Sequence, residues 1–146
     1  MNYRPQTKAQ RKVVLLVEDS PTQALGTQAV LEECGLTVVC AINGIMGIQL
    51  AYQVYPDAIV LDVQMPDLNG FQVCEELKKD PETAKIPIIM LTRQDTPESF
   101  ALGMQAGAID FIPKDPFAMA VLRETLRQMG LINTPERKDS DPDKVD

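Results

Sequence analysis

Five short apolar runs are spaced along the chain, and polar segments separate them. The runs are rich in Val, Ile and Leu and show no regular alternation with polar residues. This pattern is typical of strands that are buried on both faces of a parallel sheet. The predicted strands cover residues 13–17, 36–41, 57–62, 87–92 and 108–112.

The polar segments carry the signals of helix ends. Ser20 can cap a helix whose first position is Pro21, and Gln23 can complete a capping box with Ser20. Gly35 is placed to stop this helix, and Asn43 can cap the next one. Five helices are predicted: residues 21–34, residues 44–54, a third from the loop 63–70 to about 79, a short one that Thr96 opens, and a last one from Asp115 to about 129.

Strands that alternate with helices predict an α/β fold. Parallel strands need crossover connections, and helices in the crossovers cover both faces of the sheet. The crossovers are expected to be right-handed. We therefore predict one domain over residues 12–130, a doubly wound five-stranded parallel sheet with five helices. The polar residues 1–11 and 131–146 are predicted to be flexible tails.

Acidic charge dominates the predicted domain. Lys and Arg are absent between Val13 and Leu77, whereas nine Asp and Glu residues occur there, and the net charge of the chain is −7. We therefore expect no nucleic-acid partner. No apolar run is long enough for membrane insertion or a signal peptide.

Histidine is absent, and the three Cys residues form no CxxC pair. The absence of histidine excludes catalytic triads, His-ligated metals and a phosphohistidine on this chain. An odd number of Cys residues argues against a disulfide framework, so a reducing cytoplasm is the expected location.

Chemically useful side chains stand at the ends of the predicted strands. Glu18 and Asp19 follow the first strand, Asp62 ends the third, Thr92 ends the fourth, and Lys114 lies just past the fifth. The carboxyl ends of parallel strands meet at one edge of the sheet, so we expect these side chains to converge there. Each of them alone is an ordinary polar group at a strand end, but the whole set is unusual.

This set of side chains is suited to phosphoryl transfer. Three carboxylates at one edge repel one another, which raises their pKa values or requires a cation. Mg²⁺ is the best candidate, because it favours a few carboxylates, retained waters and a phosphate. Asp62 can then attack a phosphoryl donor, while Lys114 and Thr92 contact the oxygens of the transferred group.

The motifs at these strand ends resemble those of a known family. They are LLVEDS, DAIVLDVQMPDLNGFQV, PIIMLT and DFIPK. Together they are similar to the receiver domain of two-component response regulators, the CheY-like family, over about residues 12–130. The resemblance implies the flavodoxin-like strand order 2-1-3-4-5.

The resemblance also implies roles for the acidic residues. Asp62 corresponds to the phosphoacceptor, Asp19 to a direct ligand of Mg²⁺, and Glu18 to the residue that holds metal-bound waters. The backbone carbonyl of Gln64 corresponds to a further metal ligand. Gln64 and Gln94 also occupy positions that bear on the dephosphorylation rate in the family.

Three other residues match the family's phosphate contacts and its switch. Thr92 corresponds to the switch hydroxyl, Lys114 to the phosphate-binding lysine and Phe111 to the switch aromatic, whose ring is expected to turn inward on phosphorylation. An aromatic residue in a buried strand can equally be an ordinary core residue, so both interpretations of Phe111 stay open.

This sequence departs from the family pattern next to two of these residues. Lys114 is followed by Asp115, where the family usually has proline after a cis peptide. We predict a trans peptide here, because a cis bond before a non-proline residue costs about 3–4 kcal/mol. Arg93 follows Thr92, where the family often has a small residue, and its guanidinium either covers the site or contacts the phosphate, or it points to water.

The implied function is that of a single-domain response regulator in two-component or chemotaxis-like signalling, with motility or phototaxis as the expected setting. A histidine kinase or a histidine phosphotransfer domain would donate the phosphoryl group to Asp62. Too few residues follow Gly130 for a DNA-binding module, so the expected output is a protein-binding surface. Turnover of an external substrate is not expected, so the protein is not classed as an enzyme.

The expected output surface combines the helix that Thr96 opens, the strand 108–112 and the last helix. Phe100 and Arg127 are candidate contacts for the downstream protein. Phe100 can equally be an aromatic residue that stabilises this face by packing, and Arg127 can equally be a solvated charge.

Three other functions fit parts of the pattern. A haloacid-dehalogenase-type phosphatase also uses a strand-end Asp with Mg²⁺, but it needs a second carboxylate where this chain has Gln64. A flavodoxin-like FMN carrier shares the predicted fold, but Glu18 and Asp19 would repel the FMN phosphate. The main alternative is a pseudo-receiver that binds partners without phosphorylation, which only Arg93 and Asp115 favour.

Overall fold

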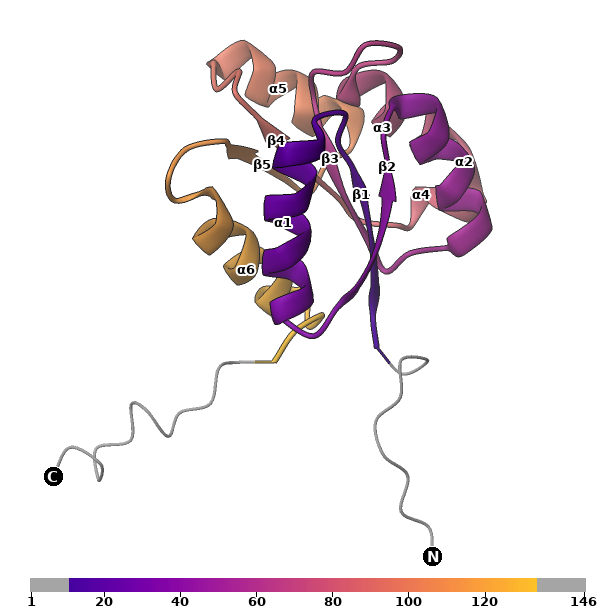
Figure 1. The fold of residues 1–146 in the computed structure, drawn as a ribbon. Helices are drawn as coiled ribbons and strands as arrows, with labels where there is room; N and C mark the ends of the chain where they lie inside the picture. The colour runs from indigo at the N-terminus through magenta and orange to yellow at the C-terminus, as the bar shows by residue number, and fades with distance from the viewer. Residues whose placement is uncertain (1–10, 134–146) are drawn as a thin grey trace, which may run out of the picture.

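The computed structural model describes residues 11–133, which contain a five-stranded sheet (Figure 1). The strand order is β2-β1-β3-β4-β5, and every neighbouring pair is parallel. This finding confirms the predicted parallel sheet and the order that the resemblance implied. The strands are β1 (Val13–Val17), β2 (Thr37–Ala41), β3 (Ala58–Asp62), β4 (Ile88–Thr92) and β5 (Asp110–Pro113).

Helices cover both faces of the sheet (Figure 1). Helices α1 and α6 pack on one face, and α2, α3 and α5 pack on the other. The helices are α1 (Pro21–Glu33), α2 (Gly44–Val54), α3 (Gly70–Lys79), α4 (Pro81–Ala84), α5 (Pro97–Ala106) and α6 (Ala118–Gln128).

Burial on both faces explains why the strand sequences show no alternation. Along β1, Leu15 and Val17 belong to the core that α2 and α3 cover, whereas Val14 and Leu16 belong to the core beneath α1 and α6. All four side chains are buried. Burial of a side chain of this kind is worth about 1.5–3 kcal/mol. Neither face of the sheet is therefore stable without its layer of helices.

The structure has six helices within residues 11–133, one more than predicted. The extra helix, α4, is a single turn that begins at Pro81, and the Asp80 carboxylate caps it by accepting a hydrogen bond from the backbone N–H of Glu82. Four residues are too few to show a helical period, so the pattern of apolar positions did not reveal this turn. The predicted fourth and fifth helices are α5 and α6.

The last helix also begins later than predicted, at Ala118 instead of Asp115. The carboxylate of Asp115 accepts a hydrogen bond from the N–H of Phe117 at 2.8 Å, and its carbonyl accepts one from the N–H of Ala118 at 3.0 Å. These two bonds close a turn, as is common for Asp at such positions. Asp115 therefore shapes the connection between β5 and α6.

The capping residue and the C-terminal end of α1 agree with the prediction. Ser20 accepts a hydrogen bond from the backbone N–H of Gln23, and Gly35 takes a positive φ of 88° just beyond the helix. The predicted flexible tails, 1–11 and 131–146, lie outside the described residues except for residues 11 and 131–133. Leu131 and Ile132 pack against the core. No helix in the described part of the chain is long and apolar enough to cross a membrane.

Candidate functional site

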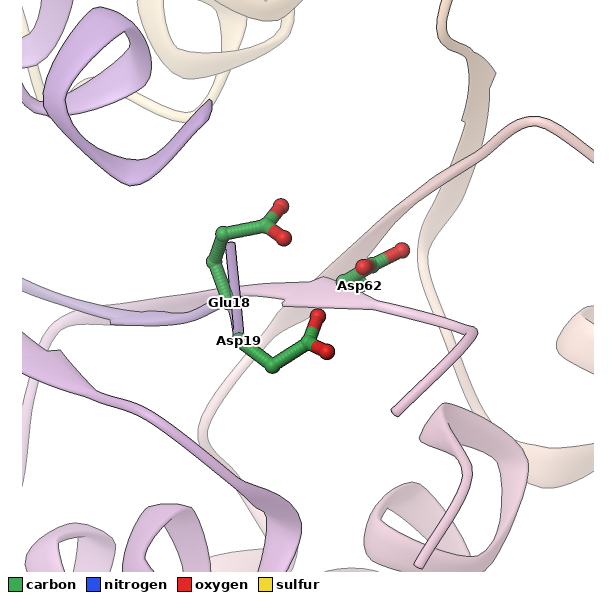
Figure 2. Close-up of side chains that lie close together, drawn as sticks. All are labelled: Glu18, Asp19 and Asp62. Atoms are coloured by element: carbon green, nitrogen blue, oxygen red, sulfur yellow. The ribbon is translucent and has the colours of Figure 1, made fainter. Parts of the chain in front are cut away.

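Three carboxylates meet at the carboxyl ends of two neighbouring strands. Glu18 and Asp19 follow β1, and Asp62 is the last residue of β3. Each offers a carboxylate oxygen, and these oxygens lie within 4.8 Å of one another (Figure 2). Glu18 and Asp62 are buried, whereas Asp19 is exposed. Because Val17 and Leu61 are paired across the two strands, the next residues, Glu18 and Asp62, reach the same point at the sheet edge.

Lys114 brings a positive charge to the three carboxylates. Its Nζ lies 3.0 Å from Oε1 of Glu18 and 3.3 Å from Oδ1 of Asp62. The amide oxygen of Gln23 accepts a hydrogen bond from the same Nζ at 2.6 Å. The backbone N–H of Lys114 donates to the carbonyl of Thr92 at 2.7 Å, which fixes the chain where it leaves the sheet.

Burial and charge act together on Asp62. The pKa of its carboxyl is raised to about 6, and burial is the largest cause. The Glu18 carboxylate also raises this pKa, whereas the Lys114 ammonium and the backbone N–H of Gln64 lower it. Three carboxylates and one ammonium therefore leave an excess of negative charge at the sheet edge. A hard divalent cation with oxygen ligands would balance this excess, and the donor set fits Mg²⁺.

A cavity of about 260 Å³ opens at this point. The three carboxylates and Lys114 line this cavity, so a cation and a phosphoryl group have room beside them. The residues that line the cavity are Glu18, Asp19, Ser20, Gln23, Asp62, Gln64, Arg93 and Lys114.

Thr92 is fully buried at the end of β4. Its hydroxyl oxygen accepts a hydrogen bond from the backbone N–H of Gln94 at 2.8 Å. The hydroxyl keeps its own proton for donation. Thr92 does not line the cavity in this structure.

Phe111 lies inward in this structure, with only 7% of its surface exposed. Its ring stacks on Phe71 with a centroid distance of 6.4 Å and meets Phe100 edge-on at 5.8 Å. Gly103 makes room for it, because a Cβ at that position would lie 2.6 Å from the Phe111 ring. This inward position fits an ordinary core residue, and a movement of the ring on phosphorylation stays a prediction.

The residues that depart from the family pattern lie next to the site. Arg93 lines the cavity and is also exposed, which fits both positions predicted for its guanidinium. No peptide bond in residues 11–133 is cis, which confirms the predicted trans bond between Lys114 and Asp115. Gln64 donates its backbone N–H to Oδ1 of Asp62 at 3.3 Å.

Comparison with known proteins places this geometry in a family. A sequence model of the response regulator receiver domain matches residues 14–127. The chain belongs to the response regulator receiver domain family. This membership supports the interpretation as a receiver domain and argues against a haloacid-dehalogenase-type phosphatase and a flavodoxin-like FMN carrier.

Relatives of this receiver domain include proteins of different length. Protein PilH of Pseudomonas aeruginosa is 43% identical over 101 residues, which is 69% of this chain and 84% of PilH. The DNA-binding dual master transcriptional regulator RpaA of Synechocystis is 37% identical over 123 residues, and the match covers 82% of this chain but only 51% of RpaA.

Solved receiver structures share the fold. The chemotaxis protein CheY4 of Vibrio cholerae has a TM-score of 0.75 at 30% identity, over 81% of this chain and 98% of CheY4. The receiver domain of a sensor histidine kinase from Pseudomonas aeruginosa has a TM-score of 0.74 at 30% identity, over 81% of this chain and 96% of that one. In that structure a magnesium ion is coordinated in the active site cleft.

Two polar residues of this receiver make contacts that the sequence did not predict. Gln23 was predicted to complete a capping box, but its amide contacts Lys114 instead. The carboxylate of Asp67 accepts hydrogen bonds from the N–H groups of Gly44 and Ile45, both at 2.9 Å. These bonds hold the pKa of Asp67 below its usual value and tie the loop after β3 to the start of α2. Both contacts join segments far apart in the sequence, so no local pattern signalled them.

Gly70 allows α3 of this receiver to approach the end of β3. Its N–H donates to the carbonyl of Val63 at 2.8 Å, and a Cβ would lie 2.8 Å from the carbonyl oxygen of Asp62. Gly70→Ala is therefore expected to lower the free energy of unfolding by about 1–3 kcal/mol, because backbone must move. Urea denaturation followed by circular dichroism measures this change.

Gly26 is the matched control for Gly70. It lies within α1, and a Cβ there would meet no atom within 4 Å. Gly26→Ala should raise the free energy of unfolding by up to about 1 kcal/mol, because alanine favours the helix. Equal effects of the two substitutions would contradict the close approach at Gly70.

Proposed function

We propose that this chain is a phosphorylation-dependent response regulator in which Asp62 accepts the phosphoryl group and Mg²⁺ is required. The observation that supports this most strongly is the convergence of three carboxylates and the Lys114 ammonium around one cavity. The donor is a phosphohistidine on a histidine kinase or a histidine phosphotransfer domain, since this chain contains no histidine.

The proposed reaction moves one phosphoryl group. A carboxylate oxygen of Asp62 forms a bond to phosphorus, and the bond from phosphorus to the donor's imidazole nitrogen breaks, with its electron pair leaving on the imidazole. Bound Mg²⁺ supplies positive charge beside the phosphoryl oxygens. Asp19, Asp62 and the carbonyl of Gln64 are its proposed direct ligands, and Glu18 holds its waters.

Lys114 and Thr92 have separate proposed roles. The Lys114 ammonium already lies 3.3 Å from Asp62, so it neutralises a second oxygen of the phosphoryl group without a large movement. The Thr92 hydroxyl donates to a further oxygen of the phosphoryl group after the loop that follows β4 moves, since Thr92 does not line the cavity in this structure. That movement is the first step by which phosphorylation changes the surface of the protein.

The proposed output surface combines α5, β5 and α6. Phe111 on β5 contacts Phe100 on α5, and half of the Phe100 surface is exposed. A change at Thr92 can therefore reach the surface through two aromatic rings, since Thr92 and Phe111 lie on neighbouring strands. Arg127 on α6 pairs with Glu124 and remains partly exposed. The similarity to PilH supports motility signalling as the setting.

A pseudo-receiver that binds partners without phosphorylation is the second candidate. The inward position of Phe111 favours it, because the ring already occupies the place expected of the phosphorylated state. The two candidates differ in whether partner binding responds to a phosphoryl group on Asp62.

Partner capture with beryllofluoride, a stable phosphate mimic, distinguishes these candidates. Wild-type protein with Mg²⁺ and beryllofluoride should retain a partner from lysate at least about tenfold more than protein without beryllofluoride, which corresponds to about 1.4 kcal/mol. Lys114→Ala should abolish this gain, because it removes the ammonium that contacts the phosphoryl group. Quantitative mass spectrometry of the retained proteins measures the ratio.

Lys79 provides the control for Lys114. It is an exposed lysine on α3 whose contact is with Glu76, so Lys79→Ala should keep the full response to beryllofluoride. Equal capture by wild-type protein with and without beryllofluoride would favour the pseudo-receiver.

A further inference from the structure

The side chain of Gln23 makes the shortest contact of the Lys114 ammonium. Oε1 of Gln23 lies 2.6 Å from Nζ, compared with 3.0 Å for Glu18 and 3.3 Å for Asp62. Gln23 lies in the first turn of α1, and it lines the same cavity as the three carboxylates. An uncharged acceptor on a helix therefore meets the charged end of a lysine from the far edge of the sheet.

A second glutamine at the same helix position shows that this contact is not the default. Gln72 is the third residue of α3, as Gln23 is of α1, and its side chain accepts a hydrogen bond from the backbone N–H of the capping residue Asn69. Ser20 caps α1 by accepting from the N–H of Gln23 alone. The Gln23 side chain leaves the capping box incomplete and turns to Lys114.

Lys114 needs a constraint at its charged end. A lysine side chain carries about 2 kcal/mol of rotamer entropy, and it acts as a point charge with no fixed geometry. The residue after it, Asp115, belongs to a hydrogen-bonded turn that leads into α6. The backbone N–H of Lys114 is held by Thr92, and Gln23 holds the other end of the side chain.

We propose that Gln23 is a positioning residue that holds the Lys114 ammonium beside Asp62 for phosphoryl transfer. The amide suits this role because it accepts a hydrogen bond without neutralising the lysine. It therefore adds no further negative charge around an ammonium that already pairs with Glu18 and Asp62. A carboxylate at position 23 would add a fourth negative charge to the cavity and repel the incoming phosphoryl oxygens. This inference rests on the proposed function of Asp62.

The test is a double-mutant cycle between Gln23 and Lys114. Gln23→Met keeps the length of the side chain and removes the acceptor, so it should lower the rate of phosphorylation by acetyl phosphate about tenfold, as expected for a lost hydrogen bond to a charged group. In a Lys114→Ala background the same substitution should change the rate less than twofold, because no ammonium remains to be positioned. Gln23→Ala serves as a second variant.

Thr22→Ala is the control, since Thr22 is an exposed neighbour in the same turn of α1, and its rate should equal that of the wild type. An equal loss from Gln23→Met in both backgrounds would overturn the proposal, because Gln23 would then act without Lys114.

Nuclear magnetic resonance of the lysine side-chain ammonium groups tests the contact without any phosphorylation. The Lys114 signal should be detectable in the wild type and in Thr22→Ala, because hydrogen bonding slows exchange of its protons with water. It should broaden or disappear in Gln23→Met. If the signal is unchanged in Gln23→Met, the positioning role is wrong. If the signal behaves as expected but the wild type takes up no phosphate, the proposed function fails while the contact stands.

Discussion

Asp62→Asn should abolish phosphorylation of the protein. With Mg²⁺ and acetyl phosphate, the wild type should gain one phosphate that is stable to acid and labile to hydroxylamine, as an acyl phosphate is. The bond from phosphorus to the acetyl oxygen breaks, and acetate leaves. An asparagine amide keeps the size of the side chain but lacks a nucleophilic carboxylate oxygen. Intact-protein mass spectrometry measures the uptake.

Asp95→Asn is the control for Asp62→Asn. Asp95 is exposed in the loop between β4 and α5, so its loss should leave the uptake of phosphate unchanged. Uptake by Asp62→Asn at the wild-type level would exclude Asp62 as the acceptor. It would also remove the reason to connect the carboxylate cluster with signalling.

Asp19→Asn should weaken Mg²⁺ binding by about tenfold or more. Asp19 is the exposed member of the cluster, and an amide oxygen replaces a full negative charge with a dipole. Substitution of a group that only supports a metal ligand lowers metal affinity by about 10–100-fold. Substitution of a direct ligand should lower it by no less. Isothermal titration calorimetry of the wild type and the variant measures the two dissociation constants.

Glu75→Gln removes one negative charge elsewhere on the same protein, from an exposed position of α3. Its affinity for Mg²⁺ should match that of the wild type, which separates a ligand role from a general effect of net charge. An unchanged affinity in Asp19→Asn would place the metal elsewhere or nowhere in this cluster.

The strands could be predicted because their burial leaves a direct mark on the sequence. Each strand faces two layers of helices, so every residue of a run such as Val13–Val17 is apolar. Chain direction then fixes where polar side chains emerge. Asp62 lies at the end of β3 and Lys114 lies after β5, so the topology brings them to one edge of the sheet whatever their separation in sequence.

The missed features depend on contacts that local patterns do not encode. The single turn α4 is shorter than the period that reveals a helix. The Gln23 side chain has two hydrogen-bonding choices, a backbone N–H in its own turn and the ammonium of Lys114, and only the folded structure shows which is taken. The position of Phe111, which the sequence left open, depends on the space beside Gly103, which lies on a different element.

We propose that Asp19, Asp62 and Lys114 form one site for Mg²⁺ and a phosphoryl group on Asp62. A crystal structure of the protein with Mg²⁺ and beryllofluoride tests it most directly. We expect beryllium bonded to a carboxylate oxygen of Asp62, Mg²⁺ bound by Asp19 and Asp62, and the Lys114 ammonium in contact with a fluoride. Beryllofluoride attached to another residue, or a metal bound away from these carboxylates, would contradict it.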